Sequence, residues 1–223
     1  MADGLSSVLE TTEPERLATG FKFTEGPLWH PDGFYYFVDL FSSRLHRIVP
    51  GKPAETVREE TRRGNGTTFD LDGNLLLCEM DNRRVTRMRP DGTIEVLADN
   101  VEGKRLNSPN DVICRSDGSI YFSNPAHRLV PMGEREVAPG IVRVTPGGTT
   151  SIVAGCEYPN GLAFSPDERT LYVANTRDAM YVHALELDAD GKVVRRRIFA
   201  DMSSNDPVGI PDGMKVDAEG HVF

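Results

Sequence analysis

Polar and apolar positions alternate along this chain in one pattern that occurs five times. Each copy opens with a polar residue followed by Gly or Asp, continues with alternating apolar positions, turns, and ends in a second apolar strand. The copies are EGPLWHPDGFYYFVDL (25–40), NGTTFDLDGNLLLCEM (65–80), NDVICRSDGSIYFSNP (110–125), NGLAFSPDERTLYVANT (160–176) and DGMKVDAEGHVF (212–223). Alternation with a period of two predicts strands. Asp-Gly between two such runs predicts a hairpin, because Gly supplies the positive φ of the turn.

The five copies share one register and a spacing typical of propeller blades. Their opening residues lie 40, 45, 50 and 52 residues apart, and the third turn residue always follows eight positions later. The stretches between the copies, such as RVTRMRPDGTIEVLA and GIVRVTPGGTTSIVA, carry a second hairpin. Repeats of this length with four strands each predict an all-β propeller. We expect a lead-in segment at 1–20 and one propeller domain at 21–223.

Phe223 falls inside the second strand of the fifth hairpin. A propeller closes so that no blade leaves a free edge. We therefore expect a ring that is incomplete at the C-terminus, with roughly 70 further residues in a closed one at this repeat length. The alternative is a short protein that completes itself by association.

The repeat also predicts where the chemistry lies. Equivalent positions of the blades surround one axis, so residues that open each innermost strand meet at one mouth of the central channel. These residues are Glu25, Asn65, Asn110, Asn160 and Asp212. Carboxylate and amide oxygens without His or Cys form a set suited to Ca²⁺, Mg²⁺ or Mn²⁺. The alternative is that each residue only caps a strand or a turn, as Asn and Asp often do.

Composition narrows the range of partners. The net charge of −9 and the short basic run Arg195–Arg197 argue against nucleic acid and anionic membranes. No apolar run approaches the roughly 20 residues of a membrane helix, and the acidic N-terminus does not resemble a signal peptide. Three widely spaced cysteines predict reduced thiols in a cytoplasmic protein. None of the five histidines shows paired metal-ligand spacing, and His127 stands out only because it follows the third hairpin. Trp29 and the aromatic run 34–37 are expected in the core.

The stretches TEGPLWHPDG, NSPNDVICRSDGSIYFSNP, YPNGLAFSPDERTLYVANT and PDGMKVDAEGHVF resemble the senescence-marker-protein, gluconolactonase and luciferin-regenerating-enzyme family, and its bacterial gluconolactonase branch in particular. The resemblance runs from about Phe21 to the end of the chain. It implies a six-bladed propeller, of which this chain lacks the last part. It also implies the metal-dependent hydrolysis of a sugar lactone.

By resemblance, a divalent cation, most often Ca²⁺, with Mg²⁺, Mn²⁺ or Zn²⁺ as alternatives, is held by Glu25, Asn160 and Asp212. Asn110 contacts the substrate or joins the ligands, and Asp212 accepts a proton from the attacking water. Asn65 is expected to orient sugar hydroxyls. Asn107 and Arg105, in the loop before the third inner strand, are expected to reach the substrate unless that loop is merely solvated. One departure is Asn124, where the family often has Asp.

Other functions remain open at this level, because propellers serve many. A non-enzymatic calcium-binding or partner-binding propeller would have wide loops and no small polar pocket. A paraoxonase-like esterase would prefer aryl esters and hydrophobic lactones, and a strictosidine-synthase-like lyase should lack the Glu/Asn/Asp set. The long loop 124–140 could be a lid or a partner site. We expect a small-molecule lactone as substrate and a monomer or homodimer as the working form.

Overall fold

The computed structural model describes residues 11, 13–177, 179–203 and 209–223. These ranges form strands and one short 3₁₀ helix, η1 (Met132–Glu134). No helix in them is long and apolar enough to cross a membrane. Sixteen of the strands build four antiparallel sheets, each with its strands in chain order. The predicted all-β architecture of four-stranded blades is therefore confirmed.

The first two sheets are β1 (Thr24–His30), β2 (Phe34–Asp39), β3 (Arg44–Ile48) and β4 (Glu55–Arg58), followed by β5 (Gly64–Phe69), β6 (Leu75–Glu79), β7 (Arg84–Met88) and β8 (Ile94–Ala98). A two-stranded ribbon of β9 (Asn100–Val101) and β10 (Lys104–Arg105) follows. The third and fourth sheets are β11 (Val112–Cys114), β12 (Ile120–Asn124), β13 (Gly140–Val144) and β14 (Thr150–Gly155), then β15 (Pro159–Phe164), β16 (Thr170–Asn175), β17 (Tyr181–Leu187) and β18 (Val193–Asp201).

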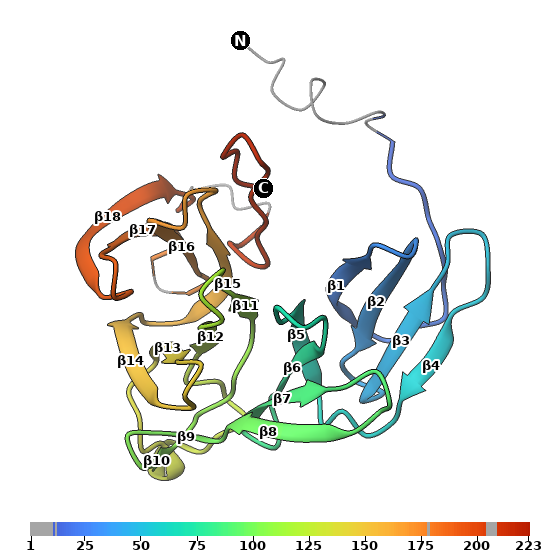
Figure 1. Cartoon of the computed structure of the whole chain (residues 1–223), viewed down its shortest axis with the longest axis horizontal. Helices are drawn as coiled ribbons and strands as arrows, with labels where there is room; N and C mark the ends of the chain where they lie inside the picture. The colour runs from blue at the N-terminus through green and yellow to red at the C-terminus, as the bar shows by residue number, and fades with distance from the viewer. Residues whose placement is uncertain (1–10, 12, 178, 204–208) are drawn as a thin grey trace.

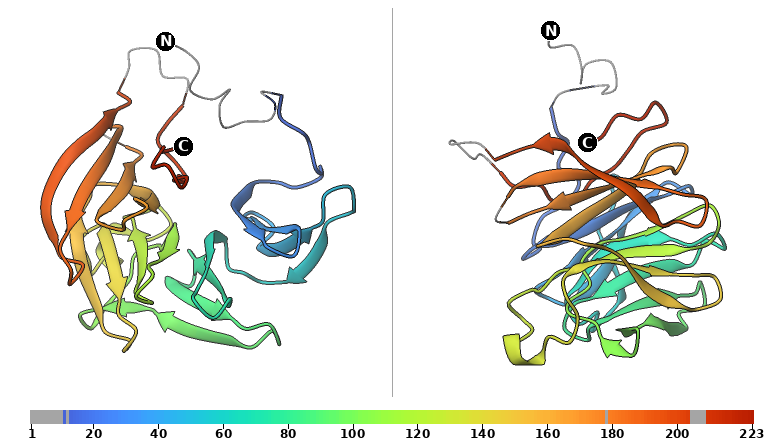
Figure 2. Two further views of the ribbon diagram at one scale, coloured as in Figure 1. Left: turned by 45° about the horizontal axis from the view of Figure 1, so that its top comes forward. Right: turned by 90° about the vertical axis from the view of Figure 1, so that its left-hand side faces the viewer.

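The sheets stand side by side around a common centre, each with its first strand innermost and its fourth outermost (Figure 1). They form an arc that is open between the first sheet and the segment 209–223 (Figures 1 and 2). That segment carries the predicted fifth hairpin in a reduced form, since only Val216 and Val222 form a bridge. The count of six blades stays a prediction.

The turns follow the sequence pattern closely. Gly33, Gly73 and Gly118, in the turns of the first three inner hairpins, have φ between 77° and 87°. In the fourth hairpin the equivalent residue is Glu168, which adopts φ 54°. A glycine is the ordinary choice at such a position, because a Cβ is strained there. The structure nevertheless keeps the same turn in all four sheets.

The core lies between neighbouring sheets rather than in one central mass. The layer between the second and third sheets contains Leu76, Val85 and Phe122, and the next contains Tyr121 and Leu171. One prediction is wrong here, because Trp29 is 48% exposed. It points away from the core along β1 while its ring contacts Tyr35. The three cysteines are free; Cys78 and Cys156 are buried and Cys114 is half-buried.

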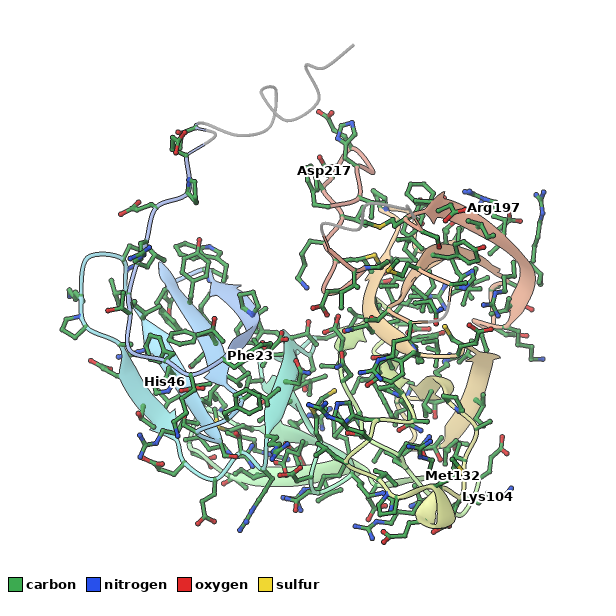
Figure 3. All side chains as sticks on the ribbon, turned by 180° about the vertical axis from the view of Figure 1, so that it is seen from behind. Phe23, His46, Lys104, Met132, Arg197 and Asp217 are labelled. Carbon is green, nitrogen blue, oxygen red and sulfur yellow. The ribbon has the colours of Figure 1, made fainter. Side chains whose placement is uncertain are left out.

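Each sheet has two ends, and they differ. At the mouth end the inner strands begin, while the turn end carries the hairpin turns, including 116–118 and 166–168. Figure 3 shows the side chains from behind, with Asp217 in the C-terminal segment and Arg197 on the outer strand β18.

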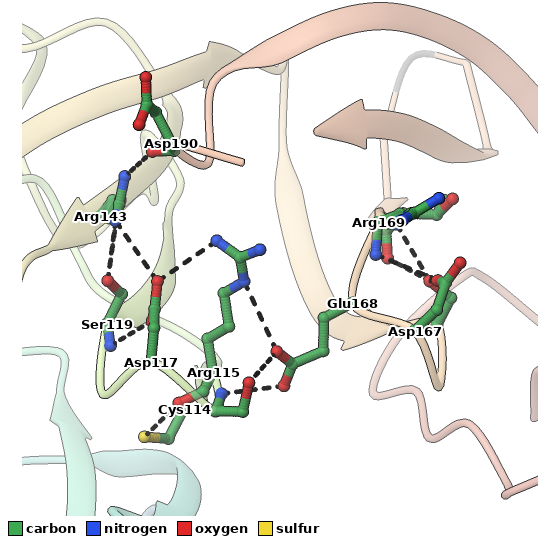
Figure 4. A network of polar contacts seen from close by, with 12 residues as sticks. Cys114, Arg115, Asp117, Ser119, Arg143, Asp167, Glu168, Arg169 and Asp190 are labelled. Atoms are coloured by element: carbon green, nitrogen blue, oxygen red, sulfur yellow. Dashed lines mark hydrogen bonds and ion pairs between the residues drawn. The ribbon is translucent and has the colours of Figure 1, made fainter. Parts of the chain in front are cut away.

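The turn end is crossed by ion pairs that join neighbouring blades (Figure 4). Arg115 pairs with Asp117 at 3.3 Å and with Glu168 of the next sheet at 3.6 Å. Arg143 donates to the hydroxyl of Ser119 at 2.9 Å and to the backbone carbonyl of Asp190. Asp117 and Glu168 at this end are thus paired with neighbouring cations.

Candidate functional site

A small cavity at the mouth end brings together all five opening residues of the repeat. Its volume is about 40 Å³. That is room for an ion or a water molecule and not for a whole sugar. The polar side chains that line it are Glu25, Asn65, Thr67, Asn110, Asp111, Asn160, Asp212 and Lys215. They come from the starts of β1, β5 and β15, from the residues before β11, and from the C-terminal segment.

The glycine that follows most of the opening residues has a packing reason. A Cβ built on Gly66 would lie within 3.0 Å of Asp111 and of the Asn110 carbonyl oxygen. The backbone N–H of Gly66 donates to that oxygen at 2.7 Å. Thr67 donates its hydroxyl hydrogen to the carbonyl of Gly26 at 2.7 Å. The inner strands touch through their backbones, and this contact holds the opening side chains around one axis.

The cavity gathers the carboxylates of Glu25, Asp111 and Asp212 beside the ammonium group of Lys215. Burial raises the pKa of Glu25 to about 7, and the negative charge of Asp212 adds to the rise. Burial also raises the pKa of Asp212, against a hydrogen bond from the side chain of Asn160. Asp212 as a whole residue is nevertheless exposed, so a ligand can still reach its carboxylate. Two carboxylates with raised pKa values in one cavity are typical of a functional site.

Two residues that line the cavity were not singled out from the sequence. Asp111 is buried and accepts backbone hydrogen bonds from Val112 at 2.9 Å and from Leu162 of the next sheet at 3.1 Å. Its pKa is raised by burial, while Lys215 lowers it. Both residues break the repeat, since Asp111 stands where the other copies have Gly and Lys215 replaces an apolar residue or Thr. That break was the available signal.

The donor atoms in the cavity fit a hard cation. Within the described ranges, no group of three or more His, Cys, Asp or Glu side chains is placed to hold a metal ion. The cavity instead presents three amides and three carboxylates, of which Asp111 is tied to the backbone by the hydrogen bonds it accepts, which leaves Glu25 and Asp212 for a ligand. An oxygen set of this kind suits Ca²⁺. A cation there would also relieve the repulsion that raises the pKa of Glu25.

The amides differ in how firmly they are held. The Asn65 side chain is buried and donates to the sulfur of Met80 at 3.6 Å, a weak acceptor. The Asn110 side chain is also buried, and its backbone N–H donates to the carbonyl of Ser123 at 3.0 Å. Asn160 is half-buried, and its side chain forms a hydrogen bond with the carboxylate of Asp212.

The structure does not bring Asn107 or Arg105 to the cavity. Asn107 is fully buried, and its side-chain nitrogen donates to the carbonyl of Val137 at 3.0 Å. Its backbone N–H donates to the side-chain oxygen of Asn124 at 2.9 Å. Asn107 therefore holds loop 124–140 near both of its ends, at Asn124 and at Val137. Arg105 is exposed in β10, where its backbone N–H donates to Glu136 at 3.1 Å. It lines a separate groove with Asn82 and Asp99.

Comparison with known proteins places the chain in a family. The model of the SMP-30/Gluconolactonase/LRE-like region matches residues 23–223. The chain belongs to this family. A gluconolactonase of Zymomonas mobilis is 30% identical over 98% of this chain and 69% of its own length. A pentonolactonase of Haloferax volcanii is 34% identical over 92% of this chain and 67% of its own.

Solved structures of the SMP-30/gluconolactonase family share the fold. A gluconolactonase of Xanthomonas campestris superposes with a TM-score of 0.82 at 34% identity, covering 91% of this chain and 69% of that one. A calcium-binding protein, regucalcin, of Agrobacterium tumefaciens gives a TM-score of 0.70 at 21% identity, covering 92% and 67%. The resemblance stated from the sequence motifs is therefore confirmed.

Proposed function

We propose that this protein hydrolyses the ester bond of a sugar lactone with the help of one divalent cation, most suitably Ca²⁺. The observation that carries the proposal is the mouth cavity, where Glu25, Asn160 and Asp212 meet with Asn110. The lactonases among its relatives support the same reaction class. Six blades in a closed ring, a cytoplasmic location, and a monomer or homodimer remain predictions.

Three residues would hold the cation, namely Glu25, Asn160 and Asp212, with Asn110 as a fourth candidate. When bound, the cation would supply Lewis-acid polarisation of the lactone carbonyl. Asp212 would accept a proton from the attacking water, because it is accessible and burial of its carboxylate raises its pKa. Asn65 and Asn110 line the same cavity and would donate hydrogen bonds to sugar hydroxyls. Asn107 and Arg105 lie outside this cavity, and the proposed reaction does not use them.

The experiment is a proton-release assay on a panel of aldonolactones, before and after complete removal of divalent cations. Activity should disappear with the metal and return with Ca²⁺, Mg²⁺, Mn²⁺ or Zn²⁺ in an order that identifies the preferred ion. Calorimetric titration of the same cations into Glu25→Gln should show weaker binding, which gives a readout separate from activity. Undiminished hydrolysis after metal removal would contradict the proposal.

The same panel separates the alternatives. A paraoxonase-like esterase should favour aryl esters and hydrophobic lactones over sugar lactones. A non-enzymatic calcium-binding propeller should bind the cation and hydrolyse none of them. The small polar cavity favours the sugar lactonase over both.

A further inference from the structure

A group of cationic and hydrogen-bonding side chains lies at the mouth end, outside the small cavity. It consists of His127, Arg128, Arg135, Tyr158 and Arg177, which we call the rim cluster. Its members come from the loop after β12 and from the two ends of the β15–β16 hairpin. The start of β15 pairs with the end of β16. Tyr158 precedes β15 and Arg177 follows β16, so both lie at the same end of the blade as Asn160. Tyr158 precedes Asn160 by two residues.

The contacts within the rim cluster are direct. The guanidinium of Arg177 lies 4.4 Å from the ring centre of Tyr158. The rings of Tyr158 and His127 lie 6.3 Å apart. Arg135 donates to the backbone carbonyls of Val130 at 3.0 Å and His127 at 3.3 Å. These contacts hold Arg135 against the backbone of His127, and Arg177 against the ring of Tyr158, which neighbours the imidazole.

Among the described residues, Arg128, Arg135 and Arg177 form no ion pair, unlike the arginines at the turn end. In the ranges the structure covers, the polar contacts of Arg135 are to carbonyl oxygens and Arg177 stacks on a ring. Burial, together with the nearby arginines Arg128, Arg177, Arg63 and Arg135, lowers the pKa of His127 to about 4. Arg63 is paired with Asp81 at 3.4 Å, so its charge is already partly neutralised. The positive charge at this rim contrasts with a whole-chain net charge of −9.

His127 is set up as a neutral donor. Its Nδ1 accepts the backbone N–H of Leu129 at 3.2 Å. An imidazole that is neutral and accepts at Nδ1 carries its hydrogen on Nε2. The rim cluster therefore offers one imidazole N–H beside three guanidinium groups, a combination that recognises carboxylate and phosphate oxygens.

From this geometry we infer that the rim cluster is a subsite for an anionic group on the substrate. The preferred substrate is then a lactone that bears a phosphate or a free carboxylate away from the reacting ester. The inference rests on the proposed lactonase function. The cation cavity would take the lactone carbonyl, and the rim would take the distal anion.

The test compares matched substrates and matched variants of the full chain. The substrates are glucono-1,5-lactone, its 6-phosphate, and glucaro-1,4-lactone, which carries a free carboxylate. The variants are Arg128→Gln and Arg177→Gln. The control is Arg197→Gln, because Arg197 also lies over an aromatic ring, Phe199 at 5.7 Å, but on the outer strand β18.

At least one anionic lactone should be hydrolysed with a kcat/KM roughly tenfold above that of the neutral lactone. Whichever is preferred identifies phosphate or carboxylate as the group recognised. Arg128→Gln and Arg177→Gln should reduce that preference roughly tenfold and Arg197→Gln should not. Raising the salt concentration should weaken the preference as well.

A binding measurement keeps the two proposals separable. Glucitol 6-phosphate and glucitol differ only in the phosphate, and neither contains an ester. Tighter binding of glucitol 6-phosphate, weakened by Arg177→Gln, would support the subsite even if every lactone were inert, in which case the lactonase function fails alone. Equal kcat/KM for neutral and anionic lactones, with all three variants alike, would overturn the subsite and leave the lactonase function standing.

Discussion

The carboxylates of the hairpin turns and those of the mouth cavity are stabilised in opposite ways. At the turn end, Asp167 accepts hydrogen bonds from Ser165 at 2.6 Å and from the backbone of Arg169 at 3.1 Å. These bonds lower the pKa of Asp167. At the mouth end, burial raises the pKa of Glu25 and of Asp212. One repeat thus carries ionised turn formers at one end and destabilised carboxylates at the other.

The difference teaches where to look for function in a repeat. The carboxylates at the turn end are satisfied by their own turns, and they need no ligand. Glu25 and Asp212, in the mouth cavity, are held in place by strand contacts that do not neutralise them, whereas Glu79 at the same end is paired with Arg58 and Arg84. The proposed cation would offset the charge of these two carboxylates.

The largest effect should come from Asp212→Ala in the full protein. The substitution removes both a proposed cation ligand and the proposed proton acceptor, so hydrolysis should fall roughly a thousandfold. Calorimetry should show that cation affinity falls with it. Asp217→Ala is the matched control, because Asp217 lies five residues later in the same segment and its pKa is lowered by His221. Retained activity in Asp212→Ala would show that the Asp212 carboxylate is not needed for hydrolysis.

Gly66→Ala should be the most damaging substitution for the fold. The added Cβ would meet Asp111 and Asn110 of the next sheet, and backbone must shift to admit it. We expect the free energy of unfolding to fall by about 3 kcal/mol. Gly73→Ala, at a turn with open space around it, should cost only about 1 kcal/mol. Denaturant titration of both variants measures the contrast, and equal losses would mean that the inner strands can separate freely.

The raised pKa of Glu25 predicts a pH dependence in the metal-free protein. Its pKa is about 7 when folded against an ordinary 4.5, so the folded state binds more protons between these values. Stability should therefore fall as pH rises from about 4.5 to 7, by about 1 to 2 kcal/mol once solvent screening is allowed for. Glu25→Gln should flatten this slope, and so should added Ca²⁺. Denaturant titrations across the pH range would show it; a slope that Glu25→Gln leaves unchanged would assign it to another group.

Asp167→Ala should have the smallest effect. It removes the turn hydrogen bonds of the fourth hairpin, so the unfolding temperature should drop slightly in a thermal scan. Lactone hydrolysis and cation affinity should stay at the level of the unaltered protein. A large loss of activity would show that the two ends are coupled and that the comparison between them is too simple.

The repeat predicted the blades because strand alternation and Asp-Gly turns are local signals. It also predicted that Glu25, Asn65 and Asn160 would converge, because equivalent positions of a propeller surround one axis. Trp29 was misassigned because alternation tells the two faces of a strand apart but not which of them is covered. In the first sheet the face carrying Trp29 is exposed.

The remaining site features depend on contacts between distant segments. Asn107 was expected at the substrate, but it bonds to Val137, and a loop contact over that separation leaves no periodic trace. Asp111 was overlooked because its partner is the backbone of Leu162 in another sheet. The rim cluster joins His127 to Arg177 across two sheets, and only the folded chain shows that they meet.

The glycine contacts at the inner strands also bear on ion size. Gly66 and Gly161 allow neighbouring backbones to touch, so the strands that carry the oxygen ligands cannot move closer to one another. Inner strands with a fixed minimum spacing do not contract around a small ion, and Mg²⁺ demands short, near-octahedral bonds that Ca²⁺ does not. The spacing of the main chain would then set which cation is preferred. Exchanging one ligand side chain for another would change that preference little.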